Sequence, residues 1–175
     1  MIAFFFSAEH LNFYPNQRSD IMSHIHDKLA ELGIVIPPPA KPAGAYTPVV
    51  RDGLTAYVSG QPAKKDGVVV YAGKVGKDLT AEQGYEAARQ CAINSLALIE
   101  AFAGGLDNVD RILKVNGYVN SAPDFTQHPK VINGASEFLI KIFGDAGRHA
   151  RTALGVAALP SDSAVEIEMI VRLKK

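Results

Sequence analysis

The chain has 175 residues, of which 47% are hydrophobic and 21% are charged, and its 18 basic residues balance 18 acidic residues. This composition is typical of one globular domain with a substantial core, and it excludes a chain that is attracted as a whole to nucleic acid or to an anionic membrane. The single cysteine, Cys91, excludes an internal disulfide framework, so we expect a cytoplasmic protein with neither nucleic acid nor membrane as a partner.

The first 40 residues divide into two parts. "MIAFFF" is too short to span a membrane and lacks the basic residues that begin a signal peptide, so we interpret residues 1–21 as an extension that is either mobile or an artefact of the start position. Residues 22–40 show apolar residues at helical spacing and then several prolines, which indicates a short helix and a stiff connector. The remaining residues, 41–175, form the principal domain.

Strands and helices alternate along the principal domain. Period-two alternation of apolar residues marks the strands, whereas a capping box, Thr80 with Gln83, and a diglycine delimit the longer helix. The order predicts an α+β fold in which a mixed sheet packs both helices on one face. The expected elements are strands over 46–51 and 54–61, an edge strand or loop over 67–73, a helix over 80–103, a strand over 110–120, a helix over 127–143, and strands over 151–159 and 164–173.

The last two expected strands carry residues that could form a site for a small acid. Arg151 begins a strand whose other residues are small or apolar, and Glu166 lies on the next strand. If these strands pair, the two side chains can lie on the same side of the sheet, with Ala153 and Gly155 leaving space beside them. A cross-strand ion pair would explain the same residues without a site, so both interpretations stay open.

Several short motifs follow one another along most of the chain, from about residue 37 to residue 171. They are "AGAYTPVVRDGLTAYVSGQ", "NGYVNSAPDF", "VINGASEFL" and "RTALGVAALPSDSAVEIEMIV". In this order they resemble the Rid family of reactive-intermediate (imine) deaminases, also called the YjgF-like or endoribonuclease L-PSP family. The resemblance implies a chorismate-mutase-like fold and a homotrimer around a central barrel, with sites at the subunit interfaces.

The resemblance also implies roles for individual residues. Arg151 matches the arginine that binds the substrate carboxylate, and Glu166 matches the carboxylate that positions water. The implied reaction is hydrolysis of 2-imino or enamine acids to 2-keto acids and ammonia, with no metal and no other cofactor. The further residues implied to contact the substrate are Tyr46, Ser59, Gly60 and Asn133.

Departures from the family pattern keep other functions open. Ala45 replaces the proline before the tyrosine, and Ala153 stands where many deaminases carry cysteine. His149 with Ala150 replaces an aromatic-proline pair before the arginine. A trimer that binds small acids without catalysis is therefore an alternative. A ribonuclease or translation inhibitor, which one family name suggests, is disfavoured by the balanced charge and by the lack of a histidine pair for RNA cleavage.

The residues outside these motifs receive structural interpretations. His24 and His26 have no ligand pattern around them, so the sequence predicts no metal site. Cys91 lies among apolar residues of the longer helix and is expected to be packed rather than reactive. His128 and His149 are expected at the surface or at an interface between subunits.

Overall fold

The computed structural model describes residues 24–175, so the expectation of an extension over residues 1–21 lies outside the described residues. The order of the elements follows the sequence expectation closely. Their bounds are α1 His24–Glu31, β1 Val49–Asp52, β2 Thr55–Pro62, β3 Lys64–Lys65, β4 Val68–Val69, α2 Ala81–Ala103, η1 Leu106–Asn108, β5 Val109–Asn120, α3 His128–Phe143, η2 Gly144–Gly147, β6 Ala150–Val156, η3 Pro160–Asp162 and β7 Val165–Leu173.

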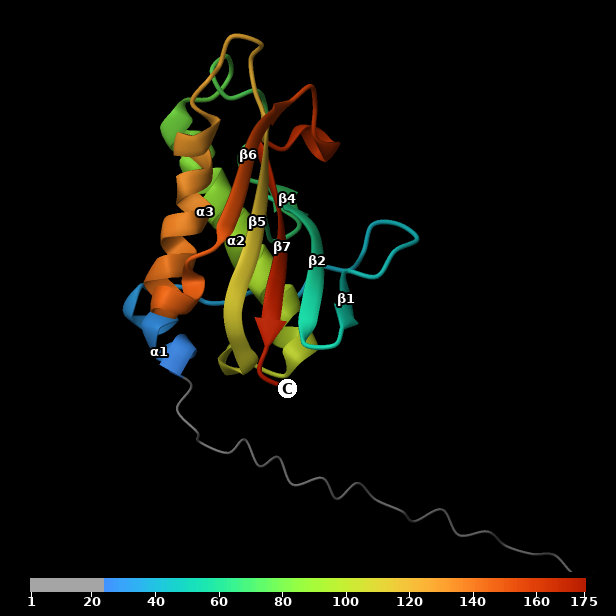
Figure 1. Ribbon diagram of the computed structural model, residues 1–175. Coiled ribbons are helices and arrows are strands. Elements are labelled where there is room, and N and C mark those ends of the chain that lie inside the picture. The colour runs from blue at the N-terminus through green and yellow to red at the C-terminus, as the bar shows by residue number, and fades with distance from the viewer. Residues whose placement is uncertain (1–23) are drawn as a thin grey trace, which may run out of the picture.

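Five strands form one mixed sheet in the order β1-β2-β7-β5-β6. All neighbouring pairs are antiparallel except β5 and β6, which run parallel. The helices α2 and α3 lie side by side on one face of the sheet, and the other face is not covered by any element of residues 24–175 (Figure 1). The expected α+β architecture is confirmed.

Two expected strands differ in detail from the structure. The segment over 67–73 contributes β4, which pairs with β3 in a separate hairpin rather than at an edge of the main sheet. The strand that was expected to reach residue 159 ends at Val156, because the chain then turns through η3, where Ser161 and Asp162 adopt positive φ angles of 55° and 54°.

Caps fix both ends of α2 where the sequence predicts them. The Thr80 hydroxyl accepts a hydrogen bond from the Gln83 backbone N–H at 3.2 Å, and Gln83 Oε1 accepts one from the Thr80 backbone N–H at 2.9 Å. At the other end Gly104 adopts a φ of 73° and its N–H donates to the Glu100 carbonyl. These bonds satisfy backbone groups that the helix leaves unpaired at its ends.

The two long helices meet backbone to backbone at Gly134 of α3. A Cβ atom at this position would collide with the backbone carbonyl oxygen of Tyr85 on α2. Backbone atoms of a capped helix cannot move aside as a flexible side chain can. Gly134 therefore sets the spacing between α2 and α3, and with it the position of α3 over the sheet. The buried α3 side chains around it are Val131, Ile132, Ala135, Phe138, Leu139 and Ile142.

The segment before the sheet belongs to the same core. Leu29 of α1 is 1% exposed, and Ile34 and Ile36 of the proline-rich connector pack against the core cluster. The short helix expected from residue 22 is present as α1 within the described part of the chain, and it contacts α3. Among residues 24–175, no helix combines the length and the apolar character that a membrane crossing requires.

Cys91 lies in the interior between α2 and the sheet. Its side chain is fully buried, and its Sγ donates a hydrogen bond to the Val165 carbonyl at 3.3 Å. Burial raises the pKa of this thiol well above its ordinary value. The expectation of a packed cysteine is confirmed.

Substituting Gly134→Ala should destabilise the protein although alanine is the better helix former. The new methyl group would push α2 and α3 apart, and such overpacking costs about 1–3 kcal/mol of unfolding free energy, which lowers Tm by several degrees in a chain of this size. Thermal unfolding followed by circular dichroism measures the effect. Lys141→Ala, at an exposed position of the same helix, is the matched control and should leave Tm nearly unchanged. A wild-type Tm in Gly134→Ala would contradict the proposed close approach.

Candidate functional site

The register of β6 determines on which side of the sheet Arg151 lies. β6 pairs with β5, so that Arg151 is level with Val115, which in turn is level with Met169 of β7. Val115 and Met169 are buried beneath the helices. Residues that are level on neighbouring strands point to the same face. The Arg151 side chain therefore lies on the helix side of the sheet, at its outer edge.

Glu166 lies on the opposite face. It is level with Tyr118 of β5, and its neighbours along β7, Val165 and Ile167, are the residues that point into the core. The expectation that Arg151 and Glu166 share a face was wrong. It assumed that the last two strands pair directly, whereas β5 lies between β6 and β7 and sets the register of both.

The Arg151 guanidinium is held by neutral groups of α3. Its Nη1 donates to Asn133 Oδ1 at 2.7 Å and to Ser136 Oγ at 3.2 Å. Within residues 24–175 the half-buried Arg151 forms no ion pair with a carboxylate. The interpretation as a cross-strand ion pair was therefore also wrong. A positive charge at this depth, held only by neutral acceptors, is suited to an anionic ligand.

Both N–H groups of Nη1 are used in these two bonds. The other three N–H groups of the guanidinium, on Nε and Nη2, form no hydrogen bond with residues 24–175. Nε and Nη2 together are one of the edges through which arginine binds a carboxylate with two parallel hydrogen bonds. Asn133 and Ser136 thus hold the guanidinium and leave a carboxylate-binding edge open.

Two further residues behind Arg151 were not identified as site residues from the sequence. Ser136 Oγ lies 3.0 Å from His149 Nε2, and His149 Nδ1 lies 2.6 Å from the Gly147 carbonyl oxygen. Burial, with a smaller contribution from the Arg151 charge, lowers the pKa of His149, while the hydrogen bond to the Gly147 carbonyl acts in the opposite direction. The spacing of Asn133 and Ser136 by three residues, which places both on one face of a helix, was a signal for Ser136.

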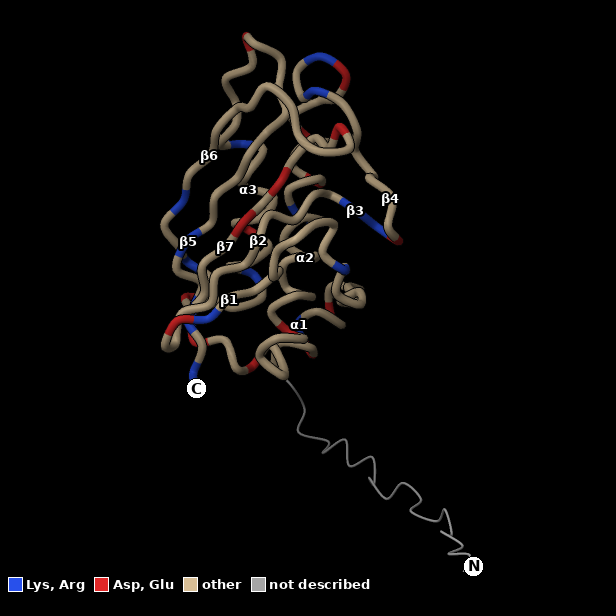
Figure 2. Tube along the Cα trace, turned by 90° about the vertical axis from the view of Figure 1, so that its right-hand side faces the viewer, with Lys and Arg blue, Asp and Glu red and all other residues tan. Residues whose placement is uncertain are grey.

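Glu166 forms a second group on the open face with the bulge in β2. A Cβ atom at Gly60 would meet the Glu166 carboxylate, so the Glu166 side chain lies directly against the β2 backbone at this glycine. Burial, and secondly the negative charge of Glu168, raise the pKa of Glu166. Ser59 precedes Gly60 in the same bulge. The acidic residues of β7 lie in the middle of the sheet (Figure 2).

Glu168 differs from Glu166 in its surroundings. It accepts hydrogen bonds from Asn116 Nδ2 at 2.7 Å and from the Tyr118 hydroxyl at 2.9 Å. The two carboxylates thus differ in their surroundings: Glu168 is held by two hydrogen bonds, whereas burial first, and the charge of Glu168 second, raise the pKa of Glu166.

Tyr46 lies apart from both groups. It is 49% exposed and precedes β1, which is the edge of the sheet opposite to β6. The residues expected to form one site therefore occupy three places in a single subunit. Asn133 and Arg151 lie together between α3 and β6, Ser59, Gly60 and Glu166 lie together on the open face, and Tyr46 lies at the far edge.

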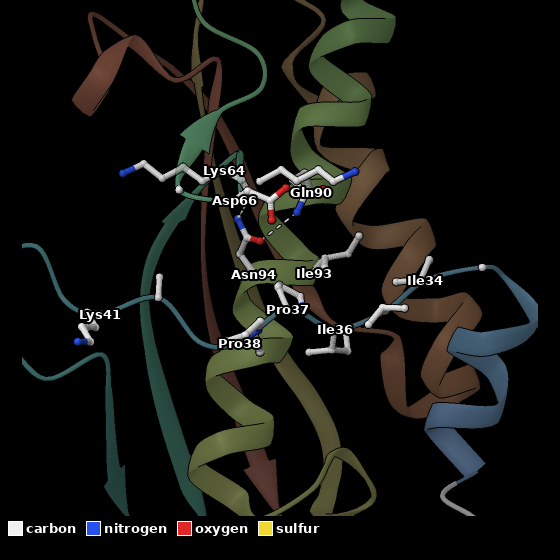
Figure 3. Close-up of a pocket in the computed structure, with 16 residues that line it drawn as sticks. Ile34, Ile36, Pro37, Pro38, Lys41, Lys64, Asp66, Gln90, Ile93 and Asn94 are labelled. Carbon is white, nitrogen blue, oxygen red and sulfur yellow. Dashed lines mark hydrogen bonds between the residues drawn. The ribbon is translucent and has the colours of Figure 1, made fainter.

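A cavity of about 840 Å³ lies elsewhere, between the proline-rich connector, α2 and the β3–β4 turn (Figure 3). None of the expected site residues lines it. Its buried polar residue, Asn94, donates to the carbonyls of Pro62 and Lys64 and accepts from Gln90, so these groups hold the hairpin against α2. No group of three or more metal-binding side chains occurs in the described range, 24–175.

Comparison with known proteins agrees with this architecture. A family model described as "YjgF/chorismate_mutase-like, putative endoribonuclease" matches residues 26–173. The Protein TCP17 of Trypanosoma cruzi is 44% identical over 146 residues, which cover 83% of this chain and 91% of that protein. A 2-iminobutanoate/2-iminopropanoate deaminase of Dermatophagoides farinae is 31% identical over 136 residues, which cover 75% of this chain and 88% of that protein.

A solved structure supports the same assignment. The crystal structure of the protein Atu1372 from Agrobacterium tumefaciens matches with a TM-score of 0.80 at 39% identity, covering 86% of this chain and 93% of the other. The family resemblance drawn from the sequence motifs is thus confirmed over nearly all described residues. This chain belongs to the YjgF/chorismate mutase-like family.

Proposed function

We propose that this protein hydrolyses reactive 2-imino and enamine acids to 2-keto acids and ammonia. The observation that carries the proposal is the half-buried Arg151, which has no carboxylate partner among residues 24–175 and whose Nε and Nη2 edge is open. A 2-imino acid supplies the missing carboxylate and places its C=N carbon next to it. The distant similarity to a protein named as a 2-iminobutanoate/2-iminopropanoate deaminase supports the same substrate class.

The reaction needs a held water molecule and a group that exchanges protons. Arg151 binds the substrate carboxylate and fixes the imine carbon in place. Glu166 takes a proton from water as the water oxygen bonds to that carbon and the C=N π electrons move to nitrogen. Glu166 returns that proton to nitrogen, which gives a neutral carbinolamine. It then takes the proton of the new hydroxyl group and delivers it to nitrogen as the C=O bond forms and the C–N bond breaks, so that ammonia leaves and a 2-keto acid remains. The raised pKa of Glu166 favours its holding the proton between the two transfers.

Assembly would complete the site in this proposal. Arg151 and Glu166 lie on opposite faces of one subunit, so a second copy must supply one of them. The open face of the sheet also carries apolar side chains that are about half exposed, Tyr57 at 48% and Leu154 at 51%. Packing these faces around an axis would bury them and bring Glu166, Ser59, Gly60 and Tyr46 of one copy to Arg151 of another. We propose the homotrimer implied by the family resemblance, and a cytoplasmic location stays a prediction.

Binding without catalysis is the alternative function. Ala153 is two residues from Arg151 on the same side of β6 and offers no reactive group beside the bound acid. Such a protein would use Arg151 in the same way but would not need Glu166. RNA cleavage, to which the family description refers, has less support because the chain's 18 basic residues are balanced by 18 acidic ones.

Removal of the arginine tests the proposed function directly. Arg151→Ala should lower kcat/KM for 2-iminobutanoate, generated in situ, by about 100-fold or more, because the carboxylate loses its two hydrogen bonds and its orientation. Arg151→Lys should recover little of this loss, since an ammonium group cannot form the paired contact. Ammonia release is the measurement, and Arg148→Ala, a nearby exposed arginine, is the control. Full activity of Arg151→Ala would exclude a role in the reaction.

Mixing two inactive variants tests whether the site lies between subunits. After subunit exchange, a 1:1 mixture of Arg151→Ala and Glu166→Gln proteins should regain activity at about a quarter of the sites by random assortment. Light scattering at micromolar concentration should show a homotrimer for both variants and for the mixture. A mixture that stays inactive despite confirmed exchange would place both residues in one subunit's site.

Neutralising Glu166 should stabilise the fold at high pH while abolishing turnover. The folded-state pKa of Glu166 is raised above its ordinary 4.5, so the native state holds the proton more strongly than the unfolded state. The free energy of unfolding therefore falls as pH rises from the ordinary pKa through the raised folded-state pKa. Glu166→Gln removes that loss, so its Tm should exceed the wild-type Tm at pH 8 and match it near pH 4. Glu31→Gln, an exposed carboxylate, should change Tm at neither pH. An equal or lower Tm at pH 8 would contradict the assignment.

A further inference from the structure

The groups behind Arg151 form a chain of hydrogen bonds whose directions are determined by chemistry. The Gly147 carbonyl can only accept, so His149 Nδ1, at 2.6 Å, carries the proton of the bond between them. In the neutral imidazole the other nitrogen, Nε2, then has a lone pair and accepts. Ser136 Oγ lies 3.0 Å from Nε2 and must donate its single proton there.

This direction leaves the Ser136 oxygen as an acceptor for Arg151. The guanidinium can only donate, and its Nη1 lies 3.2 Å from Ser136 Oγ. Asn133 Oδ1, at 2.7 Å, accepts the second N–H of the same nitrogen. Two acceptors on one nitrogen restrict rotation of the planar group. They therefore determine where the open Nε and Nη2 edge points.

The surroundings of the imidazole favour its neutral form. Burial is the main cause, and the charge of Arg151, two residues further on in β6, also disfavours a second positive charge, while the hydrogen bond to the Gly147 carbonyl acts in the opposite direction. From α3 the ring meets the neutral Ser136, and from η2 it meets the Gly147 carbonyl. The nearest acidic residue of η2, Asp145, is paired with Arg148 at 3.2 Å. If His149 were protonated, Nε2 would become a donor, and two cations would converge on the Ser136 oxygen.

We propose that neutral His149 is a positioning residue, which orients Arg151 for carboxylate binding through the Ser136 hydroxyl. The proposal rests on the proposed function of Arg151, and it assigns His149 a part in that function. It also explains how a chain without the usual aromatic-proline lead-in can hold its arginine. In this role His149 acts on the substrate only indirectly, through the direction of its hydrogen bond with Ser136.

Two isosteric substitutions separate this role from general packing. Glutamine can place an acceptor where Nε2 lies, whereas asparagine can replace only the Nδ1 donor to Gly147. His149→Asn and Ser136→Ala should each weaken binding of 2-oxobutanoate, a keto acid product, by about tenfold, the loss expected for a hydrogen bond to a charged group. His149→Gln should bind within about threefold of wild type. Calorimetric titration of the intact oligomer at pH 7.5 gives the dissociation constants, and Tm is recorded for each variant.

The effects of His149→Asn and Ser136→Ala on binding should not be additive. His149→Asn combined with Ser136→Ala should bind no more weakly than either single variant, because both interrupt the same path. His128→Asn is the matched control, since His128 Nε2 lies 3.0 Å from the Ser121 hydroxyl in a similar half-buried pair that is not bonded to Arg151. It should retain wild-type affinity. An equal loss of 2-oxobutanoate affinity in His128→Asn, or an affinity of His149→Gln as weak as that of His149→Asn, would show a packing effect and overturn the proposal.

A spectroscopic measurement keeps the proposal testable if a variant is unstable. The ring nitrogen-15 chemical shifts of wild-type His149 should show the Nδ1–H tautomer at pH 7.5. An Nε2–H tautomer would overturn the assignment. Failure of this inference is distinguishable from failure of the proposed function. Loss of binding in Arg151→Ala together with wild-type binding in Ser136→Ala and His149→Asn would reject only the positioning role. Wild-type binding in Arg151→Ala would reject the function itself.

Discussion

The contact between the Arg151 guanidinium and the two polar side chains of α3 is the interaction on which the candidate site depends. It joins the edge strand β6 to the helix beside it with a permanently charged group and two neutral acceptors. A carboxylate in place of either acceptor would neutralise the arginine and so weaken its attraction for an anionic ligand. The geometry also requires α3 to lie at a fixed height over the sheet, which the contact of Gly134 with α2 provides.

The order of elements and the family could be predicted from the sequence, but the faces of the sheet could not. Caps, apolar periodicity and turn residues are local, so Thr80, Gln83 and Gly104 define α2 without knowledge of the fold. Which strand lies beside β6 is decided by contacts between distant segments. Consecutive strands pair often, and that tendency led to the wrong placement of Arg151 beside Glu166. The parallel pairing of β5 with β6 puts the two residues on opposite faces.

The site residues likewise divide into those that the sequence indicated and those that only the fold brings together. Arg151 was recognisable because a charge opens a run of small and apolar residues, and Asn133 because its motif matches a family pattern. Ser136 and His149 are ordinary residues in the sequence, and only the fold brings their polar atoms together. The close contact of Gly60 with Glu166 could not be read from the sequence, because the two residues lie on different strands.

The interior position of Cys91 has a chemical consequence for the whole protein. The thiolate is the form that reacts with peroxides, disulfides and alkylating agents, and burial keeps this thiol protonated while the protein is folded. It is the sole cysteine of the chain, and alanine occupies position 153 beside the arginine. The folded protein therefore presents no reactive sulfur from cysteine, and the chemistry proposed for Arg151 and Glu166 is independent of the redox state of its surroundings.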